Sequence, residues 1–410
     1  MYVNVTDAFI QATAQACRTF KAKVKINNTW YEGRISSETI TSGSTSGSDI
    51  AIGSAVSARL EITMKDIGEL FENTECQVQI GILLGDGSYE YVPMGFFTAQ
   101  KPEESGGNIK FTAYDRMMKT EKAFISSLTY PATALQVLDE ACKACGITRA
   151  TIGLGTVYVS KKPEGYTCRE IIGYMASLYG KFACIDREGK LQIKWYEDPG
   201  IQVKASRLFS FTKNQSDFIL GFLACNTDKE NQLKSGTGAR GITFDNPWMT
   251  QERLDTLYKE MQGFTYRPAE FNFLGDIRLD PWDIVTVTYL DGVDYKVPVM
   301  SLTQKYDGGI NTEIKAYGKT EEETSANFQG PVVKALQRTY AELLIANEII
   351  AKKVDAEWVK ANTVTTEQLT AVNAEILNIK SNYLQVNIAD VKYAKIDLTN
   401  IAAGTIKTAM

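Results

Sequence analysis

Histidine, the residue that most often acts as a general acid or base in enzymes, is absent from this chain. Without histidine there can be no Ser-His-Asp or Cys-His nucleophile and no HExxH zinc site. Any catalysis would have to use carboxylate, lysine or tyrosine side chains. Carboxylates are plentiful, but the sequence does not bring a pair such as Glu103 and Asp115 to the separation that glycoside hydrolysis needs. We therefore interpret the carboxylates as solvated surface residues.

Two short motifs resemble ligand-binding patterns. Cys142 and Cys145 form a CxxC on the apolar face of a predicted helix, but no second pair and no histidine completes a zinc site. We interpret them as core thiols, with a redox or metal role as the alternative. Gly236, Gly238 and Gly241 match GxGxxG, but an extended stretch follows where a dinucleotide site needs a helix. We read this motif as a loop between strands, and we predict no catalytic, cofactor-binding or metal-binding residues.

Composition limits the function further. A chain of 410 residues and 45.5 kDa can hold two to four domains. Its net charge of -5 gives no electrostatic reason to bind nucleic acid or an anionic membrane. No apolar run approaches the roughly 20 residues that cross a bilayer, and the N-terminus does not read as a signal peptide. We expect a soluble protein made in the cytosol, with its seven cysteines reduced.

The first 130 residues alternate apolar and polar side chains, as half-buried strands do. Asp86-Gly87 and Gly106-Gly107 mark hairpin turns between three of the strands. The Ser- and Gly-rich stretch 41–57 is predicted to be a flexible surface loop. A short helix over 7–18 is predicted to come first, capped by Thr6 or Asp7. The predicted strands cover residues 20–26, 29–35, 57–63, 77–84, 89–99 and 108–115.

Helical spacing after Pro131 indicates an α/β insert. We predict helices over 132–145 and 166–180, each ended by a glycine, and then a hairpin over 182–196 that turns at Glu188-Gly189.

A second β-rich region begins near Leu208. It is interrupted by a helix over 246–263, for which Asn246 is the predicted cap and Pro247 the first helical residue. Residues 92–121 and 297–321 share an order of Val-Pro, Gln-Lys, Gly-Gly, Ile-Lys and Ala-Tyr. Because hairpins reuse the same turn and strand chemistry, this echo is compatible with duplication and equally with chance.

Apolar residues at alternating steps of three and four form two helical seams near the C-terminus. Pro331 opens the first seam, and a capping box from Thr365 to Gln368 opens the second. We predict that the second seam in particular associates with copies of itself, the alternative being an amphipathic helix on the chain's own body. The predicted trimerisation seam consists of Val333, Leu336, Tyr340, Leu343, Asn347, Ile350, Val354, Leu369, Val372, Ile376, Ile379, Tyr383 and Val386.

We therefore predict an α+β, mainly β chain in five parts. These are a β-domain over 1–128, an α/β insert over 129–205, a second β-domain over 206–328 that contains the helix over 246–263, a helical coiled-coil stalk over 329–387, and the start of a fibre-like β segment over 388–410. The apolar pattern is unfinished at Met410, so we expect the natural protein to continue.

Three stretches resemble the hub proteins at the distal end of phage tails. They are GFF at 95–97 ahead of a hairpin ending in FTAYD at 111–115, the Asn246-Pro247 helix followed by GFTYRP at 263–268, and LDPWDIVTV at 279–287. The resemblance covers roughly residues 1–330. It includes the baseplate hubs of contractile tails and the tail-associated proteins of long non-contractile tails, often described in prophages as tail endopeptidases. Where relatives often have Pro-Gly-Asp, this chain has Pro281-Trp282-Asp283.

The resemblance implies a homotrimer whose two tube-like β-barrels per chain form a pseudo-sixfold ring. Such a hub would cap the tail tube, contact other distal tail or baseplate proteins, adapt sixfold to threefold symmetry, carry a central fibre or spike, and let DNA pass without specific binding. The chain would then be assembled in the host cytoplasm and reside in the virion. The alternatives are a tail-associated peptidase or glycosidase that degrades the cell wall, which the missing histidines oppose, and a trimeric host-surface adhesin.

Overall fold

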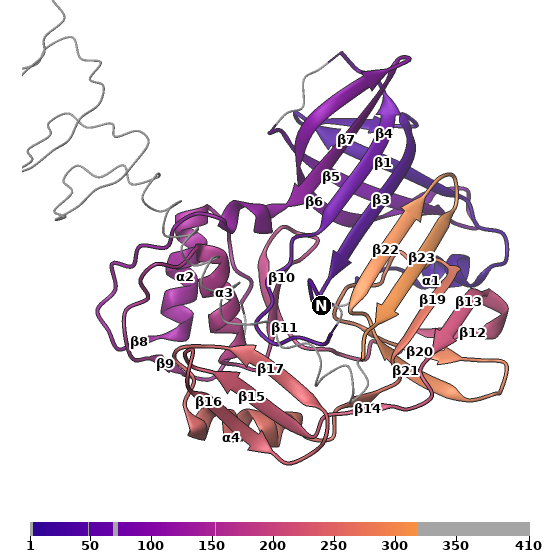
Figure 1. Ribbon diagram of the computed structural model, residues 1–410. Coiled ribbons are helices and arrows are strands. Elements are labelled where there is room, and N and C mark those ends of the chain that lie inside the picture. The colour runs from indigo at the N-terminus through magenta and orange to yellow at the C-terminus, as the bar shows by residue number, and fades with distance from the viewer. Residues whose placement is uncertain (1–2, 48, 69–72, 152, 319–410) are drawn as a thin grey trace, which may run out of the picture. The chain divides into compact units, whose positions relative to one another are not determined.

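The computed structural model describes residues 3–47, 49–68, 73–151 and 153–318 (Figure 1). The predicted seams and the fibre-like segment therefore lie outside the described residues. Within the described ranges strands greatly outnumber helices, so the prediction of a mainly β chain with some helix is confirmed. None of the helices in these ranges is both long and apolar enough to cross a membrane.

The main element is one antiparallel sheet of eleven strands, in the order β13-β19-β23-β22-β3-β4-β7-β6-β5-β1-β2. Its strands are β1 (Phe20–Ile26), β2 (Thr29–Glu32), β3 (Ile35–Gly43), β4 (Arg59–Lys65), β5 (Glu75–Leu83), β6 (Tyr89–Ser105), β7 (Asn108–Asp115), β13 (Leu208–Lys213), β19 (Ala269–Leu274), β22 (Ser301–Tyr306) and β23 (Ile310–Ala316).

Alternation of side chains explains why the first seven of these strands form a layer with a core. In β1, Phe20, Ala22, Val24 and Ile26 are buried, while the intervening lysines are not. Because successive side chains of a strand point to opposite faces, this pattern places one apolar face against the core. The apolar faces of β1 and of β3 to β7 form one cluster, against which Phe9 of α1 (Asp7–Ala14) packs. Thr6 caps α1, as the sequence predicted.

The sheet continues from the first β-region into the second through the pairing of β3 with β22. Glu38 lies opposite Tyr306 at one end of this pair, and Gly43 lies opposite Ser301 at the other. Figure 1 shows the early strands and the late strands side by side at this point. Strands from both sides of residue 206 therefore share one hydrogen-bonded ladder, although they are far apart in the sequence.

The insert contains two helices that pack against each other, α2 (Ala134–Cys145) and α3 (Cys168–Ser177). Both begin with a reciprocal capping box, in which Thr133 pairs with Gln136 and Thr167 with Glu170. Gly146 ends α2 in the left-handed conformation, with φ of 65°. The insert also contains β8 (Ala132–Thr133), β9 (Tyr158–Val159) and the hairpin of β10 (Phe182–Ile185) and β11 (Leu191–Lys194).

The second β-region adds three small sheets and one helix, α4 (Gln251–Met261). The sheets are β12 (Gln202–Lys204) with β20 (Ile284–Thr288) and β21 (Asp294–Pro298), β15 (Phe222–Asn226) with β16 (Gln232–Gly236) and β17 (Gly241–Asp245), and β14 (Phe218–Ile219) with β18 (Thr265–Tyr266). Two short 3-10 helices, η1 (Arg116–Thr120) and η2 (Ala205–Arg207), complete the described elements.

The prediction of a flexible surface loop over 41–57 is wrong. Strand β3 runs to Gly43, and the chain beyond it is packed, with Ile50 and Ile52 in the core. Ser44 is buried, and its hydroxyl shares a hydrogen bond of 2.6 Å with the hydroxyl of Tyr196. The Ser- and Gly-rich composition predicted a solvated loop. The segment packs against the protein instead, because Ile50 and Ile52 are buried in the core and the hydroxyl of Ser44 has a hydrogen-bond partner within the protein.

The predicted start of the helix over 246–263 is also wrong. Helix α4 begins at Gln251, and Thr250 caps it by accepting the N–H of Arg253 at 3.2 Å. Asn246 is fully buried instead, and its amide donates to Tyr174 O and Ser177 Oγ, both at 2.8 Å. The side chain that was expected to cap α4 therefore bonds to the last turn of α3.

Glu38 is an unusual residue in the core of the first β-region. It is 1% exposed, and neither carboxylate oxygen has a hydrogen-bond partner among the described residues. Burial raises its pKa to about 8. Its charge also helps burial to raise the pKa of Cys76 on β5 to about 12. The carboxyl group is therefore protonated in the folded protein at neutral pH.

We predict that Glu38→Gln removes a pH-dependent loss of stability. In the unfolded chain a glutamate ionises near pH 4, whereas the folded protein holds this proton until about pH 8. The free energy of unfolding of the wild type should therefore fall between these values, by on the order of 3–5 kcal/mol in total. Urea unfolding at pH 5 and pH 9 should show the variant to be the more stable protein only at the higher pH.

The exposed residue Glu103 provides a matched control, since Glu103→Gln makes the same chemical change on the surface. It should leave the pH profile of unfolding unchanged. A wild-type profile that is flat from pH 5 to pH 9 would contradict the prediction.

Candidate functional site

The most concentrated group of buried charges in the described residues surrounds segment 274–283, which joins β19 to β20. Beyond Leu274 this segment forms neither helix nor regular strand before Ile284, yet most of its side chains are buried. A buried backbone that is not part of a ladder must find other partners for its N–H and C=O groups. Arginine side chains from remote parts of the chain supply much of what this segment needs.

Two of these arginines lie near the ends of other elements. Arg18 follows α1, and its Nη1 donates to Gly275 O at 2.6 Å. Arg207 precedes β13, and its Nη2 donates to Leu274 O at 3.2 Å. Burial, together with the positive charge of Arg207, lowers the pKa of Arg18 to about 10. Arg18 nevertheless stays protonated at neutral pH, so its donors remain available.

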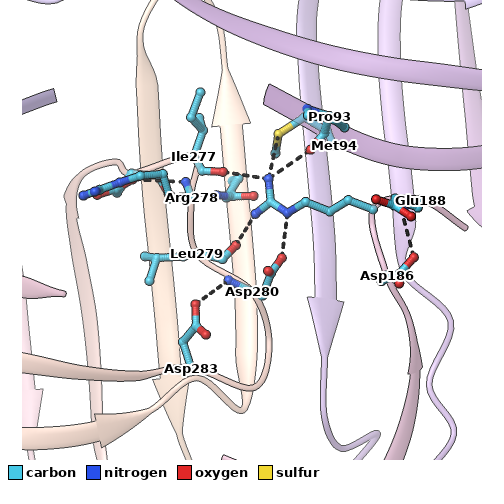
Figure 2. Close-up of polar contacts among 12 residues, drawn as sticks. Pro93, Met94, Asp186, Glu188, Ile277, Arg278, Leu279, Asp280 and Asp283 are labelled. Atoms are coloured by element: carbon cyan, nitrogen blue, oxygen red, sulfur yellow. Dashed lines mark hydrogen bonds and ion pairs between the residues drawn. The ribbon is translucent and has the colours of Figure 1, made fainter. Parts of the chain in front are cut away.

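Arg187 is the central member of the group and lies in the turn between β10 and β11. Its guanidinium group bonds to segment 274–283, whose residues Ile277, Leu279 and Asp280 are labelled in Figure 2. It donates to Ile277 O at 2.8 Å and to Leu279 O at 2.7 Å, while its Nε donates to Asp280 Oδ1 at 2.7 Å. The side chains of the Arg187–Asp280 ion pair are only 13% and 9% exposed.

The same guanidinium group also contacts the first β-region. Nη1 of Arg187 donates to Pro93 O at 3.0 Å and lies 3.5 Å from Met94 Sδ. At this place the pairing of β6 with β5 shifts by one residue, so that Met94 has no partner on β5. The planar side chain of Arg187 thus bonds both to β6 and to the second β-region, while the residue itself belongs to the insert. Arg187 therefore connects three regions of the chain. We call Arg18, Arg187, Arg207 and segment 274–283 the arginine junction.

Two aspartates of the junction have pKa values shifted in opposite directions. Asp283 closes the turn at Pro281-Trp282 by accepting the N–H of Asp280 at 2.9 Å. Burial and then the charge of Asp280 raise the pKa of Asp283 to about 7. Burial also acts to raise the pKa of Asp276, but the hydrogen bonds and charge of Arg278 outweigh it, and the pKa falls below its usual value.

The junction leaves little room for a substrate. A cavity of about 50 Å³ lies beside Arg187 and Asp280, bordered by Met94 and Trp282. Ligand pockets are usually several hundred Å³. The arrangement can therefore hold three regions of the chain in a fixed relation, but its geometry does not suit binding and turning over a small molecule.

The CxxC cysteines predicted as core thiols both lie in the core, on α2. A third cysteine, Cys168 on α3, lies next to them, and a hydrogen bond to Cys145 adds to burial in raising its pKa far above the usual range. No group of three or more His, Cys, Asp or Glu side chains within the described ranges could hold a metal ion.

The GxGxxG glycines lie between two strands, at the end of β16 and the start of β17. A strand follows them, where a dinucleotide site requires a helix. Gly238 passes close to Gly221, since a Cβ atom at Gly238 would lie only 2.3 Å from Gly221 Cα. This close approach of two backbones explains why glycine is needed there.

Asp115 and Glu103 are far apart on their hairpin. Asp115 lies opposite Phe97, whereas Glu103 lies opposite Lys110 near the turn. Glu103 is exposed, but Asp115 is buried and accepts the hydroxyl of Ser57 at 2.7 Å, and burial raises its pKa to about 6. The interpretation of the carboxylates as surface residues is therefore wrong for Asp115.

Comparison with known proteins indicates the class of fold. No protein-family model and no curated protein matches the sequence. Among solved structures, the chain is similar to phage tail proteins, as the sequence resemblance predicted. One is the tail protein from Neisseria meningitidis MC58, with a TM-score of 0.51 and 11% identity over 72% of this chain and 96% of that chain.

Two further similar structures are also tail proteins. Prophage tail protein gp18 from Listeria monocytogenes EGD-e has a TM-score of 0.48 and 12% identity, over 77% of this chain and 99% of that chain. The 43 kDa tail protein of prophage MuSo2 from Shewanella oneidensis has a TM-score of 0.46 and 15% identity, over 72% and 97%. At such low sequence identity, the similarity to the Neisseria tail protein shows a shared fold and does not show a shared function.

We predict that Arg187→Met strongly destabilises the folded chain. It would leave the Asp280 carboxylate and the carbonyl groups of Ile277 and Leu279 buried without their donor. Removing one partner of a buried ion pair typically costs about 3–5 kcal/mol. Urea unfolding followed by tryptophan fluorescence should show the free energy of unfolding to be lower by that amount, with the midpoint shifted to lower urea concentration. Adding Asp280→Asn should restore part of the loss, because the unpaired charge is then removed.

Arg59→Met is the matched control, since the Arg59–Glu61 pair is largely exposed, with side chains 50% and 39% accessible. It should change the free energy of unfolding by less than about 1 kcal/mol. An Arg187→Met variant as stable as the Arg59 control would show that the junction does not hold the regions together.

Proposed function

We propose that this chain is a structural hub at the distal end of a phage or phage-like tail. In this proposal three copies cap the tail tube, contact neighbouring tail and baseplate proteins, adapt sixfold to threefold symmetry, and anchor a central fibre or spike, while DNA passes through without specific binding. The protein then resides in the virion. The observation that carries the proposal is the tail-protein fold, in which one sheet runs through both β-regions.

The two echo segments support the idea of two similar barrels in each chain. The first forms the β6–β7 hairpin, and the second forms β22–β23 with the end of β21 before them. Both interrupt their ladder after Val-Pro. At Pro93 the register of β6 shifts, and at Pro298 β21 ends before β22 begins at Ser301. A shared interruption at the same point of the motif favours duplication over chance.

The edges of the eleven-stranded sheet support assembly with further chains. Among the described strands, β2 pairs only with β1, and β13 pairs only with β19. Both edges carry a large aromatic residue with an accessible side chain, Trp30 at 37% and Phe209 at 62%. Open edges with apolar side chains favour pairing with another chain. In a ring of copies, such edges would be covered.

We further propose that this chain is not an enzyme. The complete absence of histidine is the main support, because it removes the usual general bases and nucleophile partners. The purified chain should cause no turbidity loss in a suspension of cell walls over a time in which a lytic enzyme clears it. Clearing that is abolished by a single Asp or Glu substitution would favour the peptidase or glycosidase alternative instead.

The trimer is tested through the second seam, Leu369 to Val386, whose structure lies outside the described residues. β-Branched residues occupy both apolar positions of its heptad, a mixture that disfavours a strict dimer. Light scattering of the full chain should give three times the 45.5 kDa of one chain. Replacing Ile376 and Ile379 together with Asp should abolish the trimer, because each buried Ile lost costs on the order of 1–3 kcal/mol per chain.

Thr370→Asp with Asn378→Asp is the matched control, because it adds the same two charges at positions outside the heptad seam. This control should remain trimeric. A monomeric wild type at micromolar concentration, or a seam variant that keeps the trimer mass, would contradict the proposed assembly.

A further inference from the structure

A second cavity lies away from the arginine junction and is lined by residues of the insert and of α4. Its volume is about 210 Å³. Three separate stretches form its wall: the loop 153–157 before β9, the residues Tyr179 and Lys181 between α3 and β10, and α4, which contributes Arg253 and Glu260. The loop is attached to the wall by the hydroxyl of Tyr179, which donates to Gly155 O at 3.0 Å.

Lys181 contributes a cation for which the described residues provide no hydrogen bond or ion pair. Its side chain is half-buried, and burial lowers its pKa. An ammonium group that is partly removed from water normally has a counter-ion or an acceptor within reach. The carboxylates of Glu197 and Glu260 act on this ammonium group through space, but neither makes an ion pair with it among the described residues. An ammonium group without a bonded partner at the wall of a cavity suits an anionic ligand.

Arg253 contributes a second cation that is already held in position. Its Nε donates to Leu178 O at 2.7 Å, and its guanidinium carbon lies 5.9 Å from the centre of the Tyr179 ring. The two terminal nitrogens have no partner among the described residues. Because the side chain is oriented by these contacts, an anion could bind to its free N–H groups with little loss of side-chain entropy.

The cavity also contains one opposing charge. Glu260 lies seven residues after Arg253 on α4, which places both on the same face of the helix. The carboxylate of Glu197, which pairs with Lys194 outside the lining, and to a smaller extent that of Glu260 partly offset the positive charge at Lys181. The lining has two cations and one carboxylate, and the neighbouring Lys194–Glu197 pair adds one charge of each sign. A net positive charge remains, which an anionic ligand would neutralise.

We propose that this cavity binds a phosphate group carried on a small polyol or sugar, as a phosphate ester. The guanidinium fork of Arg253 and the ammonium of Lys181 are the groups that suit phosphate oxygens. The space beside Gly153 and Gly155 is open, since no atom lies within 4 Å of where a Cβ would stand at either residue. Both glycines are exposed, so an organic group attached to the phosphate has room to extend over this loop.

The test is a calorimetric titration of the full chain with glycerol 3-phosphate at low ionic strength, with glycerol and malonate as comparison ligands. We expect saturable binding with a dissociation constant on the order of 1 mM or tighter. Lys181→Met should weaken binding by about tenfold. Glu260→Gln should strengthen it, because the opposing carboxylate is removed.

Lys229→Met is the matched control, since it removes an exposed lysine that does not line the cavity. It should bind glycerol 3-phosphate like the wild type. A thermal scan of each variant checks that it is folded, and Lys181→Met should not unfold because its ammonium group has no partner to lose.

An independent measurement is the rate at which an amine-reactive acylating reagent modifies Lys181, followed by peptide mass mapping. Glycerol 3-phosphate should slow this reaction at Lys181 and leave it unchanged at Lys229. Absence of saturable binding, equal binding by Lys181→Met, or malonate binding as tight as glycerol 3-phosphate would each overturn the assignment.

Discussion

Buried backbone carbonyl groups that belong to no helix or sheet must accept hydrogen bonds from side chains or water, and the arrangement of this protein depends on how segment 274–283 satisfies that requirement. Arg18, Arg187 and Arg207 each donate to this segment from a different part of the chain. A guanidinium group is suited to the task because it stays charged at neutral pH and offers five donors in one plane. Parts of the chain as far apart as Arg18 and Arg207 are thus connected through segment 274–283.

The junction and the long sheet act on the same regions. Pairing of β3 with β22 joins the two β-regions by backbone hydrogen bonds, and Arg187 joins them again through Pro93 and Asp280. Glu38 lies in the β3–β22 pair. Unlike Arg187 and Asp280, its carboxyl group is buried without a partner among the described residues. Paired buried charges hold the regions together, whereas the unpaired carboxyl group makes their stability depend on pH.

These features suit the structural hub that we propose. A hub that transmits contacts between a tube and a fibre needs regions that keep their relation under load, and a network of buried ion pairs and one shared ladder provides this. The likeness to the Neisseria tail protein concerns the fold alone, so the trimer, the symmetry adaptation and the stalk depend on the proposed experiments. The phosphate-ester cavity is independent of them, because it lies within one chain and involves none of the residues of the predicted seam.

Local patterns in the sequence were enough to predict several of the elements. Strand alternation located β1 and β7 to the residue, and the glycine that ends α2 was recognisable from the sequence. These succeed because the period of apolar residues and the left-handed conformation of a C-terminal glycine depend on neighbours within one turn or one strand. The absence of histidine likewise limits the chemistry whatever the fold.

Tertiary structure alone decided the contacts between remote residues. Arg187 lies in an Asp-Arg-Glu-Gly turn that reads as exposed, and Asn246 precedes a proline as a helix cap would, yet both are buried by partners about 70 to 90 residues away. Segment 41–57 reads as a solvated loop until Ile50 and Ile52 meet the core of the insert. The number of hydrogen bonds that a side chain can donate is a property of the residue itself. Which remote acceptor receives them depends on how the chain folds back, and no local sequence pattern encodes that choice.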